Sequence, residues 1–240
     1  MKPVVIIPAR LESSRLPRKL LLDKTGKPLI IHTVEAAKKY FKTYVTTDNQ
    51  EIYNTVQNNS EAPVIITGDA KSGTDRVRKA IHFLDQIKSF PQYDIIVNWQ
   101  ADEPELDGQH VEDALREFDD GEIDIVTLAC PITRADLLSP DVVKVVVDHQ
   151  GLAMYFSRSP IPYNTTDNAL KHLGIYVFRH QILSSLGTLD ETRYPSENLE
   201  QIQWLESNLI IKVKVIPSSA NGINTIEDYE QFTKRNVEIR

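Results

Sequence analysis

Short runs of β-branched and aliphatic residues alternate with longer amphipathic segments in the first half of the chain. Residues Val4–Ile7 form one such run, as expected for a strand buried on both faces of a sheet. After Pro28, apolar residues recur at helical spacing as far as Phe41. Asp48, with Glu51 three residues later, resembles a capping box, which predicts that a helix opens at this point. Further strands are predicted at 44–47, 64–66 and 95–97, and further helices at 48–56, 74–87 and 111–118. This alternation predicts βαβ units and an α/β fold, with a mostly parallel sheet and helices on both faces.

The second half of the chain contains less helix and more strand. Strands are predicted at 125–128, 142–147, 173–178 and 212–216, with turns rich in Asp, Asn, Pro and Ser between them. Residues 160–170 show no periodicity and are predicted to form an exposed loop. We expect a β-rich lobe at about 129–180, between a nucleotide-binding part at about 1–128 and a C-terminal return at about 181–240. A length of 240 residues suits one large domain divided in this way.

Composition and charge narrow the classes of protein that this chain can represent. Cys130 is the single cysteine, so an intramolecular disulfide framework is ruled out and a reducing cytosol fits. No apolar run approaches the ~20 residues of a membrane span, and no secretory signal follows Met1, so we expect a cytoplasmic protein without membrane insertion. The net charge of −7 argues against broad nucleic-acid binding, and any anion site must therefore be a local basic cluster.

Such a cluster directly follows the first predicted strand. Its four cations, Arg10, Arg15, Arg18 and Lys19, fall within ten residues. In open α/β sheets, ligands bind beyond the carboxyl ends of the strands, which is where this loop must lie. Arginine can clamp phosphate bidentately, lysine adds a compact charge, and Ser13 and Ser14 add hydroxyl donors. The loop suits a polyphosphate, although a solvated basic loop fits these residues equally well. It lacks the glycines of a P-loop or of a GxGxxG turn, which disfavours an NAD-dependent oxidoreductase.

The stretch from Ile6 to Lys19 resembles the N-terminal signature of the 3-deoxy-manno-octulosonate (Kdo) cytidylyltransferases. Further similar blocks follow in order at 26–29, 47–48, 72–76, 98–104, 143–146, 155–162, 171–176, 199–201 and 222–225. The resemblance implies a Rossmann-like nucleotide-diphospho-sugar transferase fold and a homodimer formed through the β-rich lobe. It also implies the transfer of CMP from CTP to the anomeric hydroxyl of Kdo. The products are CMP-Kdo, for lipopolysaccharide or capsule, and pyrophosphate, with Mg²⁺ as cofactor.

Three blocks supply the nucleotide site that the resemblance implies. Its members are Pro8, Ala9, Arg10, Ser13, Ser14, Lys19, Ser72, Thr74, Arg76 and Gln100. Arg10, Arg15 and Lys19 are expected on the triphosphate and, with Asp102, form the catalytic set. Lys19 and Arg15 are placed nearest the pyrophosphate leaving group. Arg76 is our candidate for contacting cytosine, the alternative being a capped turn in which Asp75 and Arg76 face solvent.

Asp102 follows the fourth predicted strand and is our first choice of metal ligand. Mg²⁺ prefers oxygen ligands and takes only one or two carboxylates from protein beside substrate phosphates. Asn224 stands where the family usually has the second metal-binding Asp. Either the enzyme works with a more weakly held metal, which we favour, or it is a diverged homologue with altered or lost activity. Arg18 and Ala101 replace glycines that are usual in the family.

The resemblance places five residues near the sugar acid, namely Arg158, His172, Tyr176, Glu200 and Gln201. Arg158 is a natural partner for the sugar carboxylate. Gln203 stands where the family usually has Arg, so a modified or different sugar acid is an alternative substrate. An alternative from a different functional class is a homologue with weak catalysis that binds nucleotide and regulates a partner. The six histidines are scattered, without the ligand spacing of a metal hydrolase.

Overall fold

The computed structural model describes residues 1–88, 91–119, 121–187, 190, 193, 195, 197–217 and 222–236. The chain forms two compact units of mixed α/β structure. The first comprises Met1–Gly108 with Ala220–Arg240, and the second comprises Gln109–Ser219. The C-terminal segment therefore returns to the unit that contains the basic loop, and the division along the chain falls at 108 and 219.

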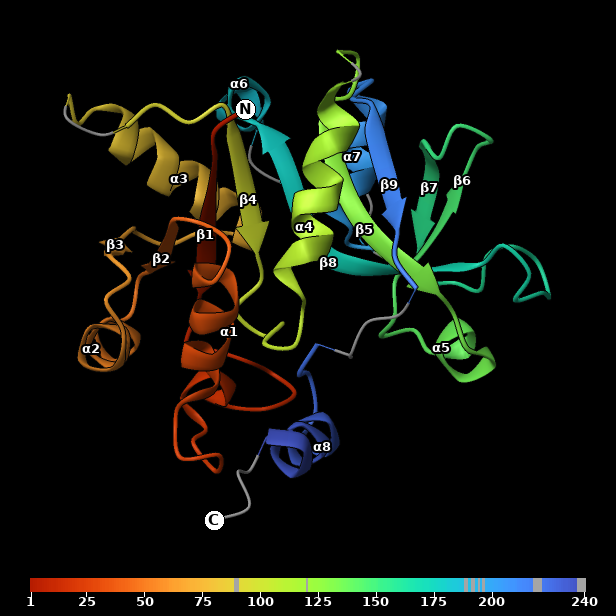
Figure 1. Ribbon diagram of the computed structural model, residues 1–240. Helices are drawn as coiled ribbons and strands as arrows, with labels where there is room; N and C mark the ends of the chain where they lie inside the picture. Colours follow the sequence, from red (N-terminus) through yellow and green to blue (C-terminus); the bar gives the residue numbers. More distant parts are fainter. Residues whose placement is uncertain are drawn as a thin grey trace. The chain divides into compact units, whose positions relative to one another are not determined.

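Four parallel strands form the sheet of the first unit, in the order β3-β2-β1-β4 (Figure 1). Their bounds are β1 (Pro3–Ala9), β2 (Thr43–Thr47), β3 (Val64–Ile66) and β4 (Ile95–Trp99). Every residue of β2 and β4 is buried. Because successive side chains of a strand point to opposite faces, this burial means that both faces of the sheet are covered. The four predicted strands and the parallel sheet are confirmed.

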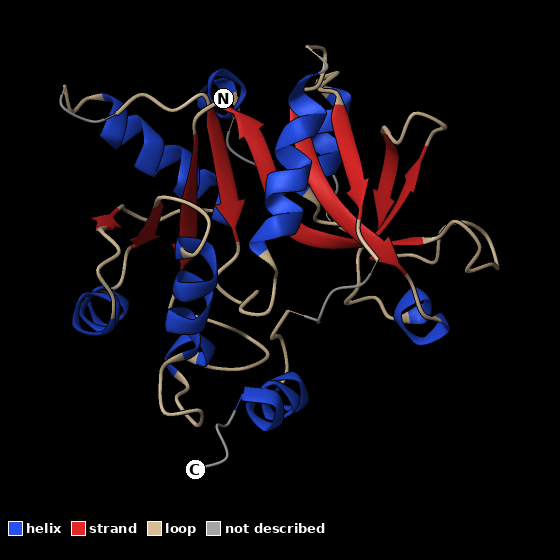
Figure 2. Cartoon of the chain, viewed as in Figure 1, coloured by secondary structure: helices blue, strands red, loops and turns tan. Residues whose placement is uncertain are grey.

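Helices α1 (Leu29–Lys38), α2 (Gln50–Asn59) and α3 (Gly73–Asp85) follow the first three strands (Figure 2). The predicted capping box at Asp48 is wrong by one residue. Asn49 is the N-cap of α2, and its side-chain oxygen accepts from the backbone N–H groups of Glu51 at 2.9 Å and Ile52 at 3.2 Å. Asp48 does not cap the helix, because its carboxylate forms an ion pair with Arg76.

The N-terminal end of α8 (Ile226–Asn236) has the predicted helix-opening box. Thr225 Oγ1 accepts from the Asp228 N–H at 3.2 Å, and Asp228 Oδ2 accepts from the Thr225 N–H at 2.8 Å. Further along this helix, Phe232 packs edge-on against His32 of α1 with ring centroids 5.0 Å apart. This packing and the cap hold residues 222–225 in a defined position within the first unit.

The second unit is built around β5 (Ile125–Pro131). It pairs antiparallel with β8 (Leu170–Arg179) and parallel with β9 (Ile211–Val215). A shorter strand, β6 (Lys144–Val147), pairs with β8 and with β7 (Ala153–Ser157). The four strands expected here are confirmed, whereas β7 was missed. Met154 and Tyr155 are both exposed at consecutive positions, so β7 lacks the alternation by which a half-buried strand is recognised.

Helices complete the second unit, and the predicted loop lies within it. The helices are α4 (Gly108–Leu115), which starts at the end of the first unit, η2 (Arg116–Asp119), α5 (Arg134–Leu138), α6 (His180–Ser185) and α7 (Glu200–Glu206). Residues 160–169 contain neither helix nor strand, and Tyr163 is 93% exposed, which confirms the exposed loop. Among the helices described in either unit, none is long and apolar enough to cross a membrane.

Candidate active site

The basic loop leaves β1 at Ala9 and runs to a short 3-10 helix, η1 (Lys19–Leu21). Arg10, Ser14 and Arg15 are exposed, whereas Leu16 is buried and anchors the loop to the core. Arg18 lies in the left-handed region at φ 57°, ψ 26°. This conformation favours glycine, because a Cβ there crowds the following carbonyl. The turn thus has a shape suited to the glycine usual in the family, although Arg18 occupies it and forms an exposed ion pair with Glu51.

Lys19 and Asp102 are in direct contact. Lys19 Nζ lies 2.5 Å from Asp102 Oδ2, and it also donates to the backbone oxygen of Ile223 at 2.9 Å. The two charged side chains are only 13% and 25% exposed. The Ile223 N–H in turn donates to the Asp102 backbone oxygen at 2.8 Å. Three segments that are far apart in the sequence, the basic loop, the end of β4 and the entry to α8, therefore meet at one point of the first unit.

Arg15 and Asn224 form a second contact between the basic loop and the entry to α8. The Arg15 guanidinium donates to Asn224 Oδ1 at 2.9 Å. The Asn224 backbone is fixed by Asp228, whose carboxylate accepts from the Asn224 N–H at 3.0 Å. The structure thus brings Arg15, Lys19, Asp102 and Asn224 together, whereas Arg10, the other expected catalytic residue, is exposed at the start of the loop.

The oxygen atoms in this region suit a hard divalent cation. Across the described residues, no group of three or more His, Cys, Asp or Glu side chains is placed to hold a metal. Asp102 nevertheless offers a carboxylate and Asn224 an amide oxygen, and Mg²⁺ completes its ligands with substrate phosphates and water. Glu103, which sequence reasoning left unassigned, also borders the segment: a Cβ on Gly222 would lie 2.5 Å from Glu103 Oε1. A side chain at 222 would therefore displace the Glu103 carboxylate from its present position.

The expected nucleotide residues on α3 and β4 form a second group at the same edge of the sheet. Ser72 caps α3 by accepting from the Asp75 N–H at 3.1 Å. Gln100 and Pro8 both lie against Gly73, since a Cβ on Gly73 would meet Gln100 Nε2 at 3.0 Å and Pro8 Cγ at 3.4 Å. Ala101, at the position of a usual glycine, is buried, so its methyl is accommodated in the core.

Arg76 is buried, and the alternative in which it faces solvent is wrong. Its guanidinium lies 2.5 Å from the Asp48 carboxylate and donates to Thr67 Oγ1 at 3.2 Å. Asp75 is buried as well and pairs with Arg78 and Lys79. Asp48 is the partner that sequence reasoning missed. Its position directly after β2 was the available signal, because carboxyl ends of parallel strands meet at one edge.

His172, Tyr176 and Gln201 gather in one aromatic cluster of the second unit. The His172 and Tyr176 ring centroids are 5.4 Å apart, and Trp204 of α7 stands edge-on to Tyr176 at 5.0 Å. Gln201 donates from its side-chain nitrogen to the Tyr176 hydroxyl. Burial raises the pKa of Tyr176 well above its ordinary value, and the Glu200 carboxylate raises it further. Three of the five expected sugar residues thus lie in this cluster, and a fourth, Glu200, is close enough to raise the pKa of Tyr176.

The protonation state of this cluster follows from its hydrogen bonds. Thr127 Oγ1 donates to the Ile175 carbonyl at 2.6 Å and lies 2.9 Å from His172 Nε2. Because the only Thr127 proton is used, His172 must donate from Nε2, which leaves Nδ1 as an acceptor. Burial lowers the pKa of His172 to about 3, so the ring is neutral at physiological pH. Among the described residues, Gln201 Oε1 is a buried acceptor without a hydrogen-bond partner.

Arg158 stands apart from this cluster in its contacts. Its guanidinium donates to the backbone oxygens of Glu197 at 3.0 Å and Pro140 at 3.1 Å. The Glu197 carboxylate accepts from the Arg158 N–H at 2.7 Å, and the buried Lys144 donates to the Arg158 carbonyl at 2.6 Å. Gln203 binds both backbone groups of Asp190 instead of the cluster.

The basic loop after β1 and the Asp102 carboxylate after β4 meet at the edge of a parallel sheet where α/β proteins bind ligands, an arrangement that fits a nucleotidyltransferase. The model of the cytidylyltransferase family matches residues 4–216, and the chain belongs to that family. The 3-deoxy-manno-octulosonate cytidylyltransferase of Chlorobium phaeobacteroides is 37% identical over 96% of this chain and 95% of its own. The Escherichia coli protein of the same name is 36% identical over 93% and 92%. A solved CMP:2-keto-3-deoxy-manno-octonic acid synthetase complexed with CTP superimposes with a TM-score of 0.86 at 35% identity, covering 98% of each chain.

Proposed function

We propose that this protein transfers CMP from CTP to the anomeric hydroxyl of Kdo and releases pyrophosphate. The observation that carries the proposal is the meeting of Lys19, Asp102, Arg15 and Asn224 in one unit of a cytidylyltransferase. Cations and oxygen ligands at one sheet edge are what a triphosphate and its metal require. The full-length similarity to Kdo cytidylyltransferases supports Kdo as the acceptor.

The chemistry assigns a role to each side chain. A sugar hydroxyl attacks the α-phosphorus of CTP in line with the departing pyrophosphate, so negative charge grows on the leaving group. Lys19 and Arg15 neutralise that charge, and Arg10, exposed at the start of the loop, binds the triphosphate tail. Asp102 and Asn224 would hold Mg²⁺, which supplies charge neutralisation when bound. Lys19 now contacts Asp102, and Arg15 contacts Asn224. When CTP binds, the two cations exchange these partners for phosphate oxygens, which frees Asp102 and Asn224 for the metal.

The aromatic cluster of the second unit supports the binding of a polyhydroxylated acid. Gln201 Oε1 is a buried acceptor, and neutral His172 offers a second acceptor at Nδ1. A hydroxyl donor from the sugar would satisfy Gln201, and a buried acceptor left unpaired costs about 1–3 kcal/mol. Arg158 is our candidate for the sugar carboxylate, which requires its guanidinium to release Pro140 or Glu197.

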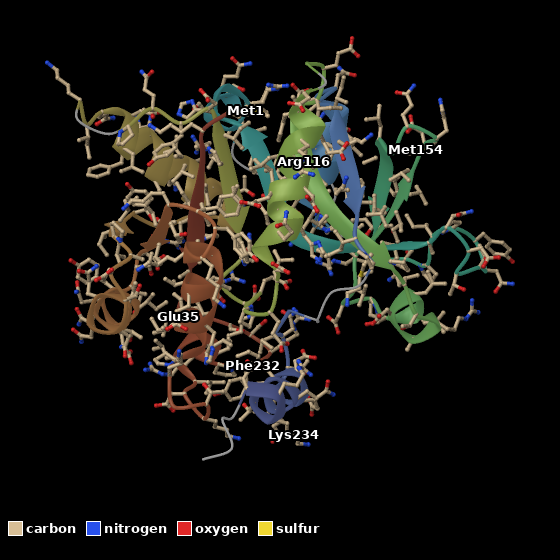
Figure 3. All side chains as sticks on the ribbon, viewed as in Figure 1. Met1, Glu35, Arg116, Met154, Phe232 and Lys234 are labelled. Atoms are coloured by element: carbon tan, nitrogen blue, oxygen red, sulfur yellow. The ribbon has the colours of Figure 1, made fainter. Side chains whose placement is uncertain are left out.

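We also propose a homodimer formed through the β-rich lobe, in a cytoplasmic protein of lipopolysaccharide or capsule synthesis. Exposed apolar side chains support an interface there: Met154 is 64% exposed, Leu138 58% and Tyr163 93%. Met154 is labelled on β7 in Figure 3. Removing such side chains from water favours association.

A second candidate function is the same transfer to a modified or different sugar acid. Gln203 supports it, because an amide that is bonded to Asp190 cannot provide the charge of the arginine usual at this position. A weakened homologue that binds nucleotide is the third reading, supported by Asn224, since an amide brings no full negative charge to a metal.

Pyrophosphate release tests these proposals. The purified protein is assayed with CTP or UTP and a panel of sugar acids that includes Kdo, over a Mg²⁺ titration. We expect turnover with CTP and Kdo, and a several-fold lower half-saturating Mg²⁺ concentration for Asn224→Asp because a carboxylate binds the cation more strongly. Asn54→Asp, which adds the same charge at an exposed position of α2, is the matched control.

The outcomes of this assay distinguish the three candidate functions and test residue 224 as a metal ligand. An unchanged metal dependence in Asn224→Asp shows that residue 224 is not a ligand. Turnover with another acid, but none with Kdo, establishes the second candidate. Binding of CTP measured by calorimetry, without turnover on any acid, establishes the weakened homologue.

A further inference from the structure

Asn98 is a polar residue in the centre of an otherwise apolar strand. The sequence of β4 is Ile-Ile-Val-Asn-Trp, and Asn98 is 0% exposed. A buried amide that lacks hydrogen-bond partners costs about 1–3 kcal/mol, so an asparagine at this position needs partners on its own side of the sheet. It has two, and they lie in the expected nucleotide site.

The two ends of the Asn98 amide bind different elements. Its nitrogen donates to Thr74 Oγ1 in the first turn of α3 at 3.1 Å, and its oxygen accepts from Gln100 Nε2 at 3.0 Å. The resulting chain, which we call the amide relay, consists of Thr74, Asn98 and Gln100. It links the beginning of α3 to the carboxyl end of β4.

The relay orients the side-chain amide of Gln100 by holding one of its two N–H groups. Gln100 Nε2 is used toward Asn98, and the carbonyl oxygen Oε1 is the other end of the same amide. The amide lies against Gly73, and glycine leaves room for it, because a Cβ at this position would come within 3.1 Å of Gln100 Oε1 and 3.0 Å of Nε2. Pro8 closes the same space, and Gln100 remains partly exposed to solvent.

We propose that Asn98 is a positioning residue that turns the Gln100 carbonyl oxygen toward the nucleotide, so that the site selects a hydrogen-bond donor there. The inference rests on the proposed function, in which Gln100 contacts CTP. Among the donors of CTP, we propose that the 4-amino group of cytosine or the 2′-hydroxyl of ribose meets this oxygen. UTP has a carbonyl oxygen in place of the amino group, and 2′-deoxy-CTP lacks the 2′-hydroxyl. Sites built to hydrogen-bond a donor reject analogues that lack it, because the protein group is left unpaired.

Direct binding of CTP, UTP and 2′-deoxy-CTP, measured by calorimetry without a sugar acid, tests the inference. The principal variant is Asn98→Leu, which has a similar shape and suits a buried strand but leaves the Gln100 amide free to rotate. We expect its preference for CTP over one of the two analogues to fall about ten-fold, while binding of that analogue changes little. Ten-fold corresponds to about 1.4 kcal/mol, the size of one hydrogen bond.

Three further variants distinguish a positioning role of Asn98 from a purely structural one. Asn98→Asp retains an acceptor for Gln100 Nε2 and is expected to keep the wild-type preference. Gln100→Met removes the amide and should lose the same preference, and the double variant Asn98→Leu/Gln100→Met should be no worse than Gln100→Met alone. Gln50→Met, at an exposed position of α2, controls for the substitution itself. Thermal unfolding confirms that each variant is folded, and if Asn98→Leu is not, Asn98→Ala, which also removes the acceptor, takes its place.

The outcomes distinguish this inference from the function on which it rests. Loss of the CTP-over-UTP preference identifies the cytosine amino group as the donor, and loss of the CTP-over-2′-deoxy-CTP preference identifies the ribose hydroxyl. Equal weakening for all three nucleotides in Asn98→Leu, or loss of preference in Asn98→Asp, overturns the positioning role. A wild-type protein that binds none of the three overturns the proposed function instead.

Discussion

The buried histidine of the sugar cluster makes the stability of this protein depend on pH in a specific window. Desolvation lowers the pKa of His172 to about 3, from an ordinary value of 6.5. Its Nε2–H is held by Thr127, and its ring packs edge-on against Phe156 with centroids 5.2 Å apart. A proton on this ring would put an uncompensated charge in an apolar site. We therefore consider the change His172→Gln, which removes the titrating group.

The size of the effect follows from the two pKa values. Between pH 6.5 and pH 3 the unfolded chain binds a proton at His172 and the folded chain does not, so stability rises with pH across this window. The slope is ~1.4 kcal/mol per pH unit for one group. At pH 4.5, two units below the unfolded value, His172 is therefore expected to remove about 2.7 kcal/mol of stability relative to pH 8.

The free energy of unfolding in urea, followed by near-ultraviolet circular dichroism of the aromatic cluster, measures this difference. Wild type and His172→Gln are compared at pH 8, 6, 5 and 4.5. Titration of the other groups cancels in the subtraction, since they are common to both proteins. We expect the variant to be less stable at pH 8, because its packing is disturbed, and to recover about 2–3 kcal/mol relative to wild type at pH 4.5.

A matched substitution and a direct observation complete this test. Asn54→Gln replaces an exposed side chain and should leave the two stability curves parallel, because it changes no ionisable group. The His172 ring protons in an NMR titration should not shift above about pH 4. A difference between wild type and His172→Gln that stays constant from pH 8 to pH 4.5 refutes the argument from burial.

Two further predictions concern stability. Lys144→Met should lower the free energy of unfolding in urea by about 3–5 kcal/mol, because the ammonium donates to three backbone oxygens in a buried site. The control Lys38→Met, at an exposed position, should change this free energy by less than about 0.5 kcal/mol. An effect of Lys144→Met below about 1 kcal/mol would show that water replaces the ammonium. Arg18→Gly should be more stable than Arg18→Ala by about 1 kcal/mol, since both lose the Glu51 ion pair but only alanine keeps a Cβ at φ 57°. The opposite order, which is normal within helices, would mean that the turn is not left-handed in solution.

Much of the first unit could be predicted from local pattern. Val4–Ile7 and 64–66 are continuous apolar runs because both faces of a parallel sheet are buried, and α1 is recognised from its helical spacing. The strand β7 was missed for the opposite reason, since Met154 and Tyr155 are exposed on adjacent positions. The cap at Asn49 was misplaced because Asp48 is equally suited to capping, and only its pairing with Arg76 decides between them.

The sequence by itself determined the α/β class, the basic loop after β1, and the residue types that a polyphosphate and a metal require. These follow from neighbouring residues, because periodicity and turn chemistry act over a few positions. Only the tertiary structure decided that Lys19 meets Asp102 and the segment before α8, residues separated by 83 and 204 positions. It also decided that Asn98 binds Gln100 and Thr74 together. Contacts of this kind depend on which strand ends and helix starts are adjacent in the folded sheet, and no local pattern carries that information.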